Sequence, residues 1–207
     1  MDHNLYIVLL SLLVCFLFVL VSLEWILRRT DQQKTPQRFL ILGSVTMGIA
    51  VWATHYMGML SIQSPIPFLY DLTTMSISLA VSFLFSYVSF FLLHYTVQRQ
   101  QNKLWAPVFT FGTGLLFVHT IGVLSMHIHP VQTDAWWISL SIGSAFLFTW
   151  IAFLTLIKSG NRYKKITVSL SLTTGVSLMH YIGEMALVGG TPTFNCIMNF
   201  RYRTLIY

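Results

Sequence analysis

Charged residues are scarce in this sequence. Asp, Glu, Lys and Arg make up 9% of the 207 residues, whereas 55% are hydrophobic and the mean hydropathy is +0.69. A soluble domain carries about 25% charged residues, so this depletion argues against an ordinary water-soluble fold and indicates that lipid is the solvent. We therefore expect an all-α integral membrane protein.

Cysteine is also rare, and the usual catalytic patterns are missing. The two cysteines, Cys15 in an apolar run and Cys196 near the end of the chain, form neither a disulfide framework nor a CxxC metal site. The sequence contains no Ser-His-Asp arrangement, phosphate-binding loop or carboxylate pair on which hydrolysis could depend. We therefore predict that this chain is not an enzyme.

Long apolar stretches are what the sequence has instead. About 20 apolar residues are needed to cross the hydrocarbon core of a bilayer as a helix. Such stretches occur six times, and all six prolines fall between them or at their starts, where a missing N–H is tolerated. We expect six transmembrane helices near residues 5–27, 39–62, 72–97, 105–126, 135–157 and 165–189.

The few charges are arranged by side of the membrane. Lys and Arg occur in the first, third and fifth gaps, whereas the second and fourth gaps contain neither and hold Asp71 and Asp134. Since basic loops stay cytoplasmic, both termini are expected outside. The net charge of +6 then reflects membrane topology, so we expect the lipid bilayer as a partner and no nucleic acid.

A histidine motif repeats along the chain. His-x-x-Gly occurs in THYMGML, VHTIGVL and MHYIGEM, at His55, His119 and His180, and Phe-Leu-Phe occurs once in each odd-numbered apolar stretch. Such periodicity predicts three copies of one helical hairpin, spanning approximately residues 1–62, 70–126 and 133–189. The remaining residues, 190–207, are expected to form a short tail outside the cytoplasm.

The repeat predicts that the three histidines share one membrane depth. Each lies about 15 residues along an even-numbered helix, or about 23 Å from the cytoplasmic face. Ionisable side chains inside a membrane are costly and usually face the bundle interior, where they mark function. The alternative is a structural role, in which each histidine bonds a neighbouring helix and each motif glycine permits close helix approach.

The residues four positions after the histidines distinguish the three copies. They are Met59, Val123 and Glu184, and each faces the same way as its histidine. A His/Met pair suits copper, particularly Cu(I), whereas a His/Glu pair suits zinc or a proton-exchange site. Glu184 is also expected to have a partner, and His180 can supply it without any metal.

These motifs resemble the MHYT domain, a bacterial integral-membrane sensory module named for Met-His-Tyr-Thr motifs carried three times in a helical bundle. The resemblance covers essentially the whole chain and implies a location in the bacterial cytoplasmic membrane. It further implies a bound copper ion near the outer face and the sensing of O2, CO or NO. Members of this family often carry cytoplasmic diguanylate cyclase, phosphodiesterase or other regulatory domains.

The resemblance also implies metal ligands, and the sequence departs from the family pattern around them. Thr54 replaces the leading methionine of the first motif, the second motif has lost both methionines, and the third has a glutamate at a methionine position. Copper is therefore the first expectation, with zinc or haem iron as alternatives. The candidate ligands are His55, Met59, His119, Met179, His180 and Glu184.

Residues 190–207 are too short and polar to carry an output domain. We therefore expect either a separate signalling membrane protein as partner or a longer parent protein. Three other functions stay open at this point. They are a small haem protein with paired histidines that handles electrons or protons, a metal carrier, and a scaffold subunit whose histidines are only structural.

Overall fold

The computed structural model describes residues 3–31, 37–63, 70–98, 103–125, 134–158 and 163–188. Within these ranges the chain forms six α-helices, and its only extended pairing is an isolated bridge between His3 and Ile62. The predicted all-α class is therefore confirmed. The helices are α1 (Leu5–Asp31), α2 (Arg38–Leu60), α3 (Leu72–Gln98), α4 (Trp105–Leu124), α5 (Ala135–Lys158) and α6 (Lys164–Val188).

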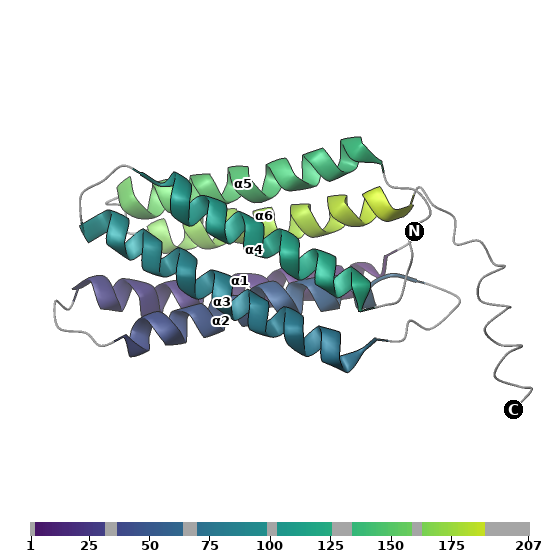
Figure 1. Ribbon diagram of the computed structural model, residues 1–207, viewed down its shortest axis with the longest axis horizontal. Helices are drawn as coiled ribbons and strands as arrows, with labels where there is room; N and C mark the ends of the chain where they lie inside the picture. The colour runs from purple at the N-terminus through teal and green to yellow at the C-terminus, as the bar shows by residue number, and fades with distance from the viewer. Residues whose placement is uncertain are drawn as a thin grey trace, which may run out of the picture.

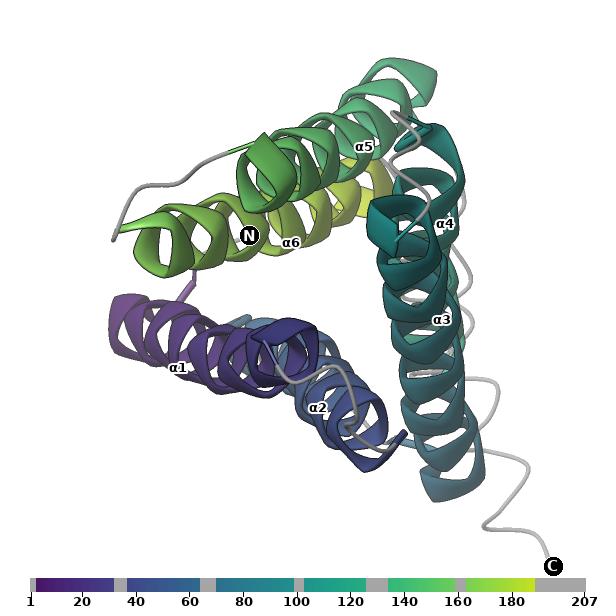
Figure 2. The same ribbon diagram turned by 90° about the vertical axis from the view of Figure 1, so that its left-hand side faces the viewer.

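The helices lie side by side along one long axis (Figure 1) and are grouped in pairs. Seen from one end, the pairs α1–α2, α3–α4 and α5–α6 form the three sides of a triangle (Figure 2). Serine hydroxyls that donate to a carbonyl of the paired helix join all three pairs, as is common between membrane helices. These bonds run from Ser22 to Gly43 (2.7 Å), from Ser89 to Pro107 (2.8 Å) and from Ser141 to Met179 (2.7 Å).

Each pair is also closed at one end of the bundle. The residue just before an odd-numbered helix donates its backbone N–H to a carbonyl at the end of the even-numbered helix that follows it. The three bonds run from Asn4 to Ser61 (2.7 Å), from Asp71 to Ser125 (2.9 Å) and from Asp134 to Ala186 (3.3 Å). Helices α2, α4 and α6 therefore finish at the same end, which is a condition for their histidines to meet. The repeat boundaries and the orientation in the membrane stay predictions.

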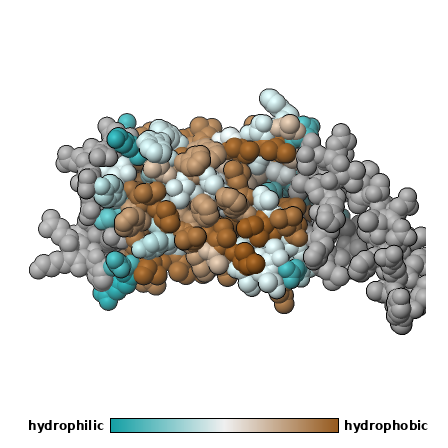
Figure 3. Space-filling model, viewed as in Figure 1, coloured by the Kyte–Doolittle hydropathy of each residue, from teal (hydrophilic) through white to brown (hydrophobic). Residues whose placement is uncertain are grey.

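The surface supports a membrane location. On the face that Figure 3 shows, a broad hydrophobic band crosses the middle of the bundle, with hydrophilic residues toward both ends. Helices α1 to α5 are each long and apolar enough to cross a membrane. An apolar outer belt of this kind would be unfavourable in water, so the bundle is built for lipid.

Helix α6 differs from the predicted sixth span in its composition. It has 25 residues, but it is not among the five helices that qualify on hydropathy. Most of its exposed residues are still apolar, namely Ile166, Leu170, Leu178 and Met185. Five of the polar residues that lower its hydropathy are buried in the bundle, as expected of a membrane helix with a functional face; they are Ser169, Thr173, Ser177, His180 and Glu184.

Three phenylalanines from different helices form the centre of the apolar core. Phe90 on α3, Phe111 on α4 and Phe153 on α5 are at most 2% exposed. Their ring centroids lie 6.0–6.4 Å apart, within the range of favourable aromatic contact. We call these residues the aromatic cluster.

Two further phenylalanines, which begin two of the three Phe-Leu-Phe copies, pack on glycines of a neighbouring helix pair. A Cβ added to Gly48 would overlap the Phe83 ring, and one added to Gly112 would overlap the Phe146 ring. Each of these glycines lies two helical turns before a motif histidine. The rings therefore hold neighbouring pairs together just below the level of the histidines.

Candidate metal centre

The ends of α2 and α4 fix the height of the first two histidines. Ser61 and Ser125 stand three residues after the motif glycines Gly58 and Gly122. Each serine hydroxyl donates to the carbonyl of its glycine at 2.6 Å. Each of these carbonyls also accepts the backbone N–H of the same serine, at 3.0 and 3.2 Å, so the serine closes the last turn of the helix with two hydrogen bonds. The two helices therefore stop one turn beyond their histidines, at corresponding positions.

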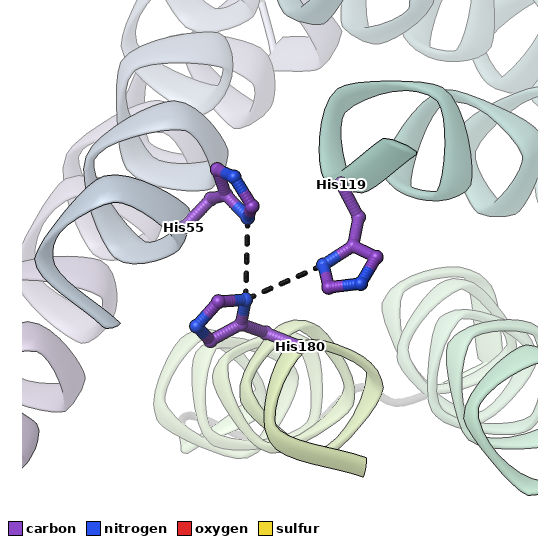
Figure 4. A group of neighbouring side chains, drawn as sticks. All are labelled: His55, His119 and His180. Carbon is purple, nitrogen blue, oxygen red and sulfur yellow. Dashed lines mark hydrogen bonds between the residues drawn. The ribbon is translucent and has the colours of Figure 1, made fainter. Parts of the chain in front are cut away.

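The three motif histidines converge on one point, as Figure 4 shows. His180 Nδ1 lies 3.2 Å from His55 Nδ1 and 3.4 Å from His119 Nδ1. His55 is 3% exposed, His180 is fully buried, and His119 is partly buried. One ring nitrogen from each histidine lies within 4.8 Å of the other two. We call His55, His119 and His180 the histidine centre.

The facing nitrogens compete for hydrogens. A neutral imidazole carries one N–H and one acceptor nitrogen. Since His180 Nδ1 faces both other Nδ1 atoms, it cannot donate to both. It donates to one of them, shares its single lone pair between two donors, or binds a cation that replaces the hydrogens where the three nitrogens meet.

The nitrogen spacing fits a single metal ion. Nitrogens bound to one ion at about 2.0–2.1 Å, in a tetrahedral arrangement, lie about 3.3–3.4 Å from one another. Two of the three separations, at 3.2 and 3.4 Å, match that edge length, and one ring nitrogen from each of the three histidines lies within 4.8 Å of the other two. Two nitrogens on opposite sides of one iron would instead be about 4 Å apart at the same bond length. The two measured separations are compatible with neighbouring ligands on one small ion.

The motif glycines make room for the outer edges of the imidazole rings. A Cβ on Gly122 would overlap the Nε2 edge of His55, and a Cβ on Gly58 would overlap that of His180. At Gly183 the added Cβ would lie 2.9 Å from the Nε2 of His119. The contacts are cyclic, because the histidine of each motif packs on the glycine of the next. From the sequence the glycines were expected to serve close helix approach; what they admit is a histidine from another motif.

Glu184 is the acidic neighbour of this centre. It is 4% exposed, and its Oε2 lies 3.8 Å from His180 Nε2, within ion-pair range but beyond hydrogen-bond range. Within the described ranges neither carboxylate oxygen has a hydrogen-bond partner, and neither has the Nε2 of His55 or His180. The expected proximity of Glu184 to His180 is therefore present, whereas metal ligation by Glu184 stays a prediction.

The two candidate methionines lie in apolar surroundings. Met59 is buried in a small cluster with Val123, Ile62 and Tyr70, and Met179 belongs to the main apolar core. Both positions are typical of methionine as a packing residue in a helical core. Their role as ligands stays a prediction carried by the family resemblance.

Tyr70 packs against the small cluster around Met59 and was not among the predicted site residues. Tyr70 precedes α3, and the centroid of its ring lies 6.1 Å from that of Tyr56. Its hydroxyl has no hydrogen-bond partner within the described residues. Burial raises the pKa of this hydroxyl, so it stays protonated at neutral pH. The His-x-x-Gly motifs give no indication of a role at the site for Tyr70, because it lies outside them in the sequence.

Comparison with known proteins identifies relatives of this arrangement. Residues 48–106, which include His55 and Gly58, match the family model MHYT, described as a bacterial signalling protein N terminal repeat. The chain is 26% identical over 193 residues to the cyclic di-GMP phosphodiesterase NbdA of Pseudomonas aeruginosa, covering 88% of this chain and 24% of that protein. It is 30% identical over 197 residues to the bifunctional diguanylate cyclase/cyclic di-GMP phosphodiesterase MucR of the same species, covering 89% and 28%.

A third relative comes from a distant bacterium. The signaling protein YkoW of Bacillus subtilis is 25% identical over 193 residues, which cover 89% of this chain and 24% of that protein. The chain thus spans about a quarter of the length of the curated relatives it matches. No solved structure matches the chain.

Proposed function

Since the chain carries the MHYT signalling repeat and is built for a bacterial membrane, we propose that it is a sensory module whose input is a metal ion held by the histidine centre. His55, His119 and His180 would each contribute Nδ1. The observation that carries this proposal is the approach of His180 Nδ1 to the Nδ1 atoms of His55 and His119, at 3.2 and 3.4 Å, by histidines from three copies of one motif. Nothing in the packing of a purely structural histidine requires three of them to share one point.

Copper is the ion that we propose first. Imidazole nitrogens suit copper and zinc alike, and the resemblance to MHYT sensors favours copper. Met59 and Met179 remain candidate soft ligands within this proposal. Three nitrogen ligands leave one position of a four-coordinate ion open, and a small ligand such as O2, CO or NO would bind there.

The chain's own residues would exclude water from the centre and hold the rings in place. His55 and His180 are almost fully enclosed, and each ring edge is fixed against a motif glycine. An ion or gas that alters the Nδ1 contacts would therefore shift α2, α4 and α6 relative to one another. We propose that this shift is the signal, and that a regulatory domain or a separate membrane protein reads it at the inner face.

Metal analysis of purified protein tests the proposal. Protein prepared without an affinity-tag metal is loaded with Cu(I), Cu(II) or Zn(II), dialysed and assayed for bound metal. Wild type should retain about one ion per chain, and the triple variant His55→Ala, His119→Ala, His180→Ala should retain none. The matched control, His94→Ala, changes a histidine on α3 outside the centre and should bind like wild type.

Each remaining result has a defined meaning. Retention of no ion by the wild type after loading, with helix content intact by circular dichroism, would refute the metal proposal and leave the structural role. A Soret absorption band in wild type that disappears in the triple variant would replace it with the haem alternative. Equal metal content in wild type and the triple variant would show that the metal binds outside the histidine centre.

A further inference from the structure

Glu184 lies on the opposite edge of the His180 ring from the histidine centre. The Nδ1 of His180 faces His55 and His119 at 3.2 and 3.4 Å, whereas its Nε2 faces Glu184 Oε2 at 3.8 Å. The two nitrogens of an imidazole point in different directions from the ring. The carboxylate therefore approaches the nitrogen that the centre does not use.

Because both side chains are buried, the contact between Glu184 and His180 affects the free energy of both. Glu184 is 4% exposed and His180 is fully buried, and neither the carboxylate oxygens nor His180 Nε2 has another hydrogen-bond partner among the described residues. A buried carboxylate without a partner is strongly unfavourable. The Nε2–H of His180 is the donor that the structure offers, and a small side-chain rotation would bring 3.8 Å into hydrogen-bond range.

We infer that Glu184 is a positioning residue that accepts a hydrogen bond from His180 Nε2–H and so keeps the Nδ1 of His180 free of hydrogen. Carboxylates that hold the far nitrogen of a metal-binding histidine fix its tautomer and raise its basicity. The free Nδ1 then accepts from His55 and His119 when no ion is present and offers its lone pair when one is. The metal part of this inference rests on the proposed function, whereas the tautomer part does not.

The three motifs are unequal in this respect. The positions that correspond to Glu184 hold Met59 and Val123, and neither side chain accepts a strong hydrogen bond from an N–H. Only His180 therefore has a carboxylate to fix its tautomer at this position. It is also the histidine whose Nδ1 contacts both others, so fixing this one ring orders all three.

Nitrogen NMR of metal-free protein labelled with 15N-histidine tests the tautomer directly. In wild type, His180 should be protonated at Nε2, and His55 and His119 at Nδ1, with signals assigned by comparison with His180→Gln. Glu184→Leu should remove this preference, so that His180 signals report a mixture of tautomers. Glu184→Gln keeps an acceptor oxygen and should preserve it. The control, Val123→Leu, changes the corresponding position of the second motif and should leave all three tautomers unchanged.

Metal affinity provides the second measurement. Loss of such a carboxylate typically weakens metal binding about 10- to 100-fold, which is the effect expected of Glu184→Leu, with a smaller loss in Glu184→Gln. If Glu184 were itself a ligand, the Leu and Gln variants would lose affinity equally while the His180 tautomer stayed unchanged, and the inference would be wrong.

Failure of the inference can be separated from failure of the metal proposal. An unchanged tautomer in Glu184→Leu overturns the inference even if wild type binds metal. A wild type that binds no metal but shows the Glu184-dependent tautomer refutes the metal proposal and leaves the positioning role standing. Should Glu184→Leu fail to fold, the Gln variant and wild type still decide the point, because a wild-type His180 protonated at Nδ1 also overturns the inference.

Discussion

The bundle contains two clusters of three rings, and they are built on opposite principles. In the aromatic cluster, Phe90, Phe111 and Phe153 lie with ring centroids 6.0–6.4 Å apart. In the histidine centre, the ring centroids lie 4.9–5.5 Å apart and the rings approach edge-on, with interplanar angles of 75–84°. The first cluster needs only contact, whereas the second brings polar nitrogens together in a buried place.

This difference separates stability from function. Phenylalanine rings gain free energy from close packing and leave no polar atom unsatisfied. The histidine centre leaves the Nε2 atoms of His55 and His180 without hydrogen-bond partners in the described part of the chain, and such groups are costly to bury. Apolar side chains at these positions would be more stable, and this cost is consistent with the proposal that the histidines bind a ligand.

The largest expected effect comes from the aromatic cluster. Phe153 is fully buried, so Phe153→Ala should lower the free energy of unfolding by about 3–5 kcal/mol. The bound metal per folded molecule should stay the same, because Phe153 does not belong to the histidine centre. Thermal unfolding in detergent, with and without metal, measures both quantities.

The triple histidine variant should differ from Phe153→Ala by losing the bound metal. A ligand that binds only the folded state raises its stability, so metal should raise the Tm of wild type and of Phe153→Ala but not of the triple variant. If Phe153→Ala also abolished the metal-dependent rise, the two clusters would be coupled and the separation drawn above would be wrong.

A second comparison tests the glycines on which the imidazole rings pack. An added Cβ at Gly122 would overlap the His55 ring, so Gly122→Ala should abolish metal binding and destabilise the bundle by about 1–3 kcal/mol. Gly143, on α5, has nothing within 4 Å of an added Cβ. Gly143→Ala should therefore bind metal normally and be neutral or up to about 1 kcal/mol more stable, because alanine is the better helix former. Equal behaviour of the two variants would contradict the packing of His55 on Gly122.

The smallest effect is expected at the candidate methionine ligand. Met59 packs with Val123, Ile62 and Tyr70, and a Met→Leu exchange conserves volume, so Met59→Leu should lower stability by less than about 1.5 kcal/mol. We expect its Cu(I) and Zn(II) affinities to change less than in any single histidine variant. Competition titrations against chelators measure both. A selective loss of Cu(I) affinity comparable to a histidine variant would extend the centre one turn outward to the thioether.

Much of the architecture could be predicted from the sequence. Six apolar stretches gave six helices whose ends lie within a few residues of those expected. The prediction was less accurate for α6, where buried polar residues lower the hydropathy although the outward face is apolar. Averaging over a window mixes the two faces of a helix, so composition understates a span whose polar side is hidden.

The site was predictable only in part. The repeated His-x-x-Gly indicated that His55, His119 and His180 share a depth, and the structure brings them together. It did not reveal that each motif glycine receives a histidine from another motif, because spacing along one helix carries no information about a neighbouring helix. The packing of Phe83 on Gly48 was hidden for the same reason.

The sequence by itself determined that this protein belongs in a membrane and that three equivalent histidines lie near the ends of three helices. Hydropathy and repetition are properties of the chain in order, so they can be read along it. Only the tertiary structure decided which edge of each imidazole ring faces the centre. It also decided that Glu184 approaches the Nε2 of His180 and not its Nδ1. That choice depends on the rotation of α2, α4 and α6 about their axes, which is set by how their histidines and glycines pack across the bundle.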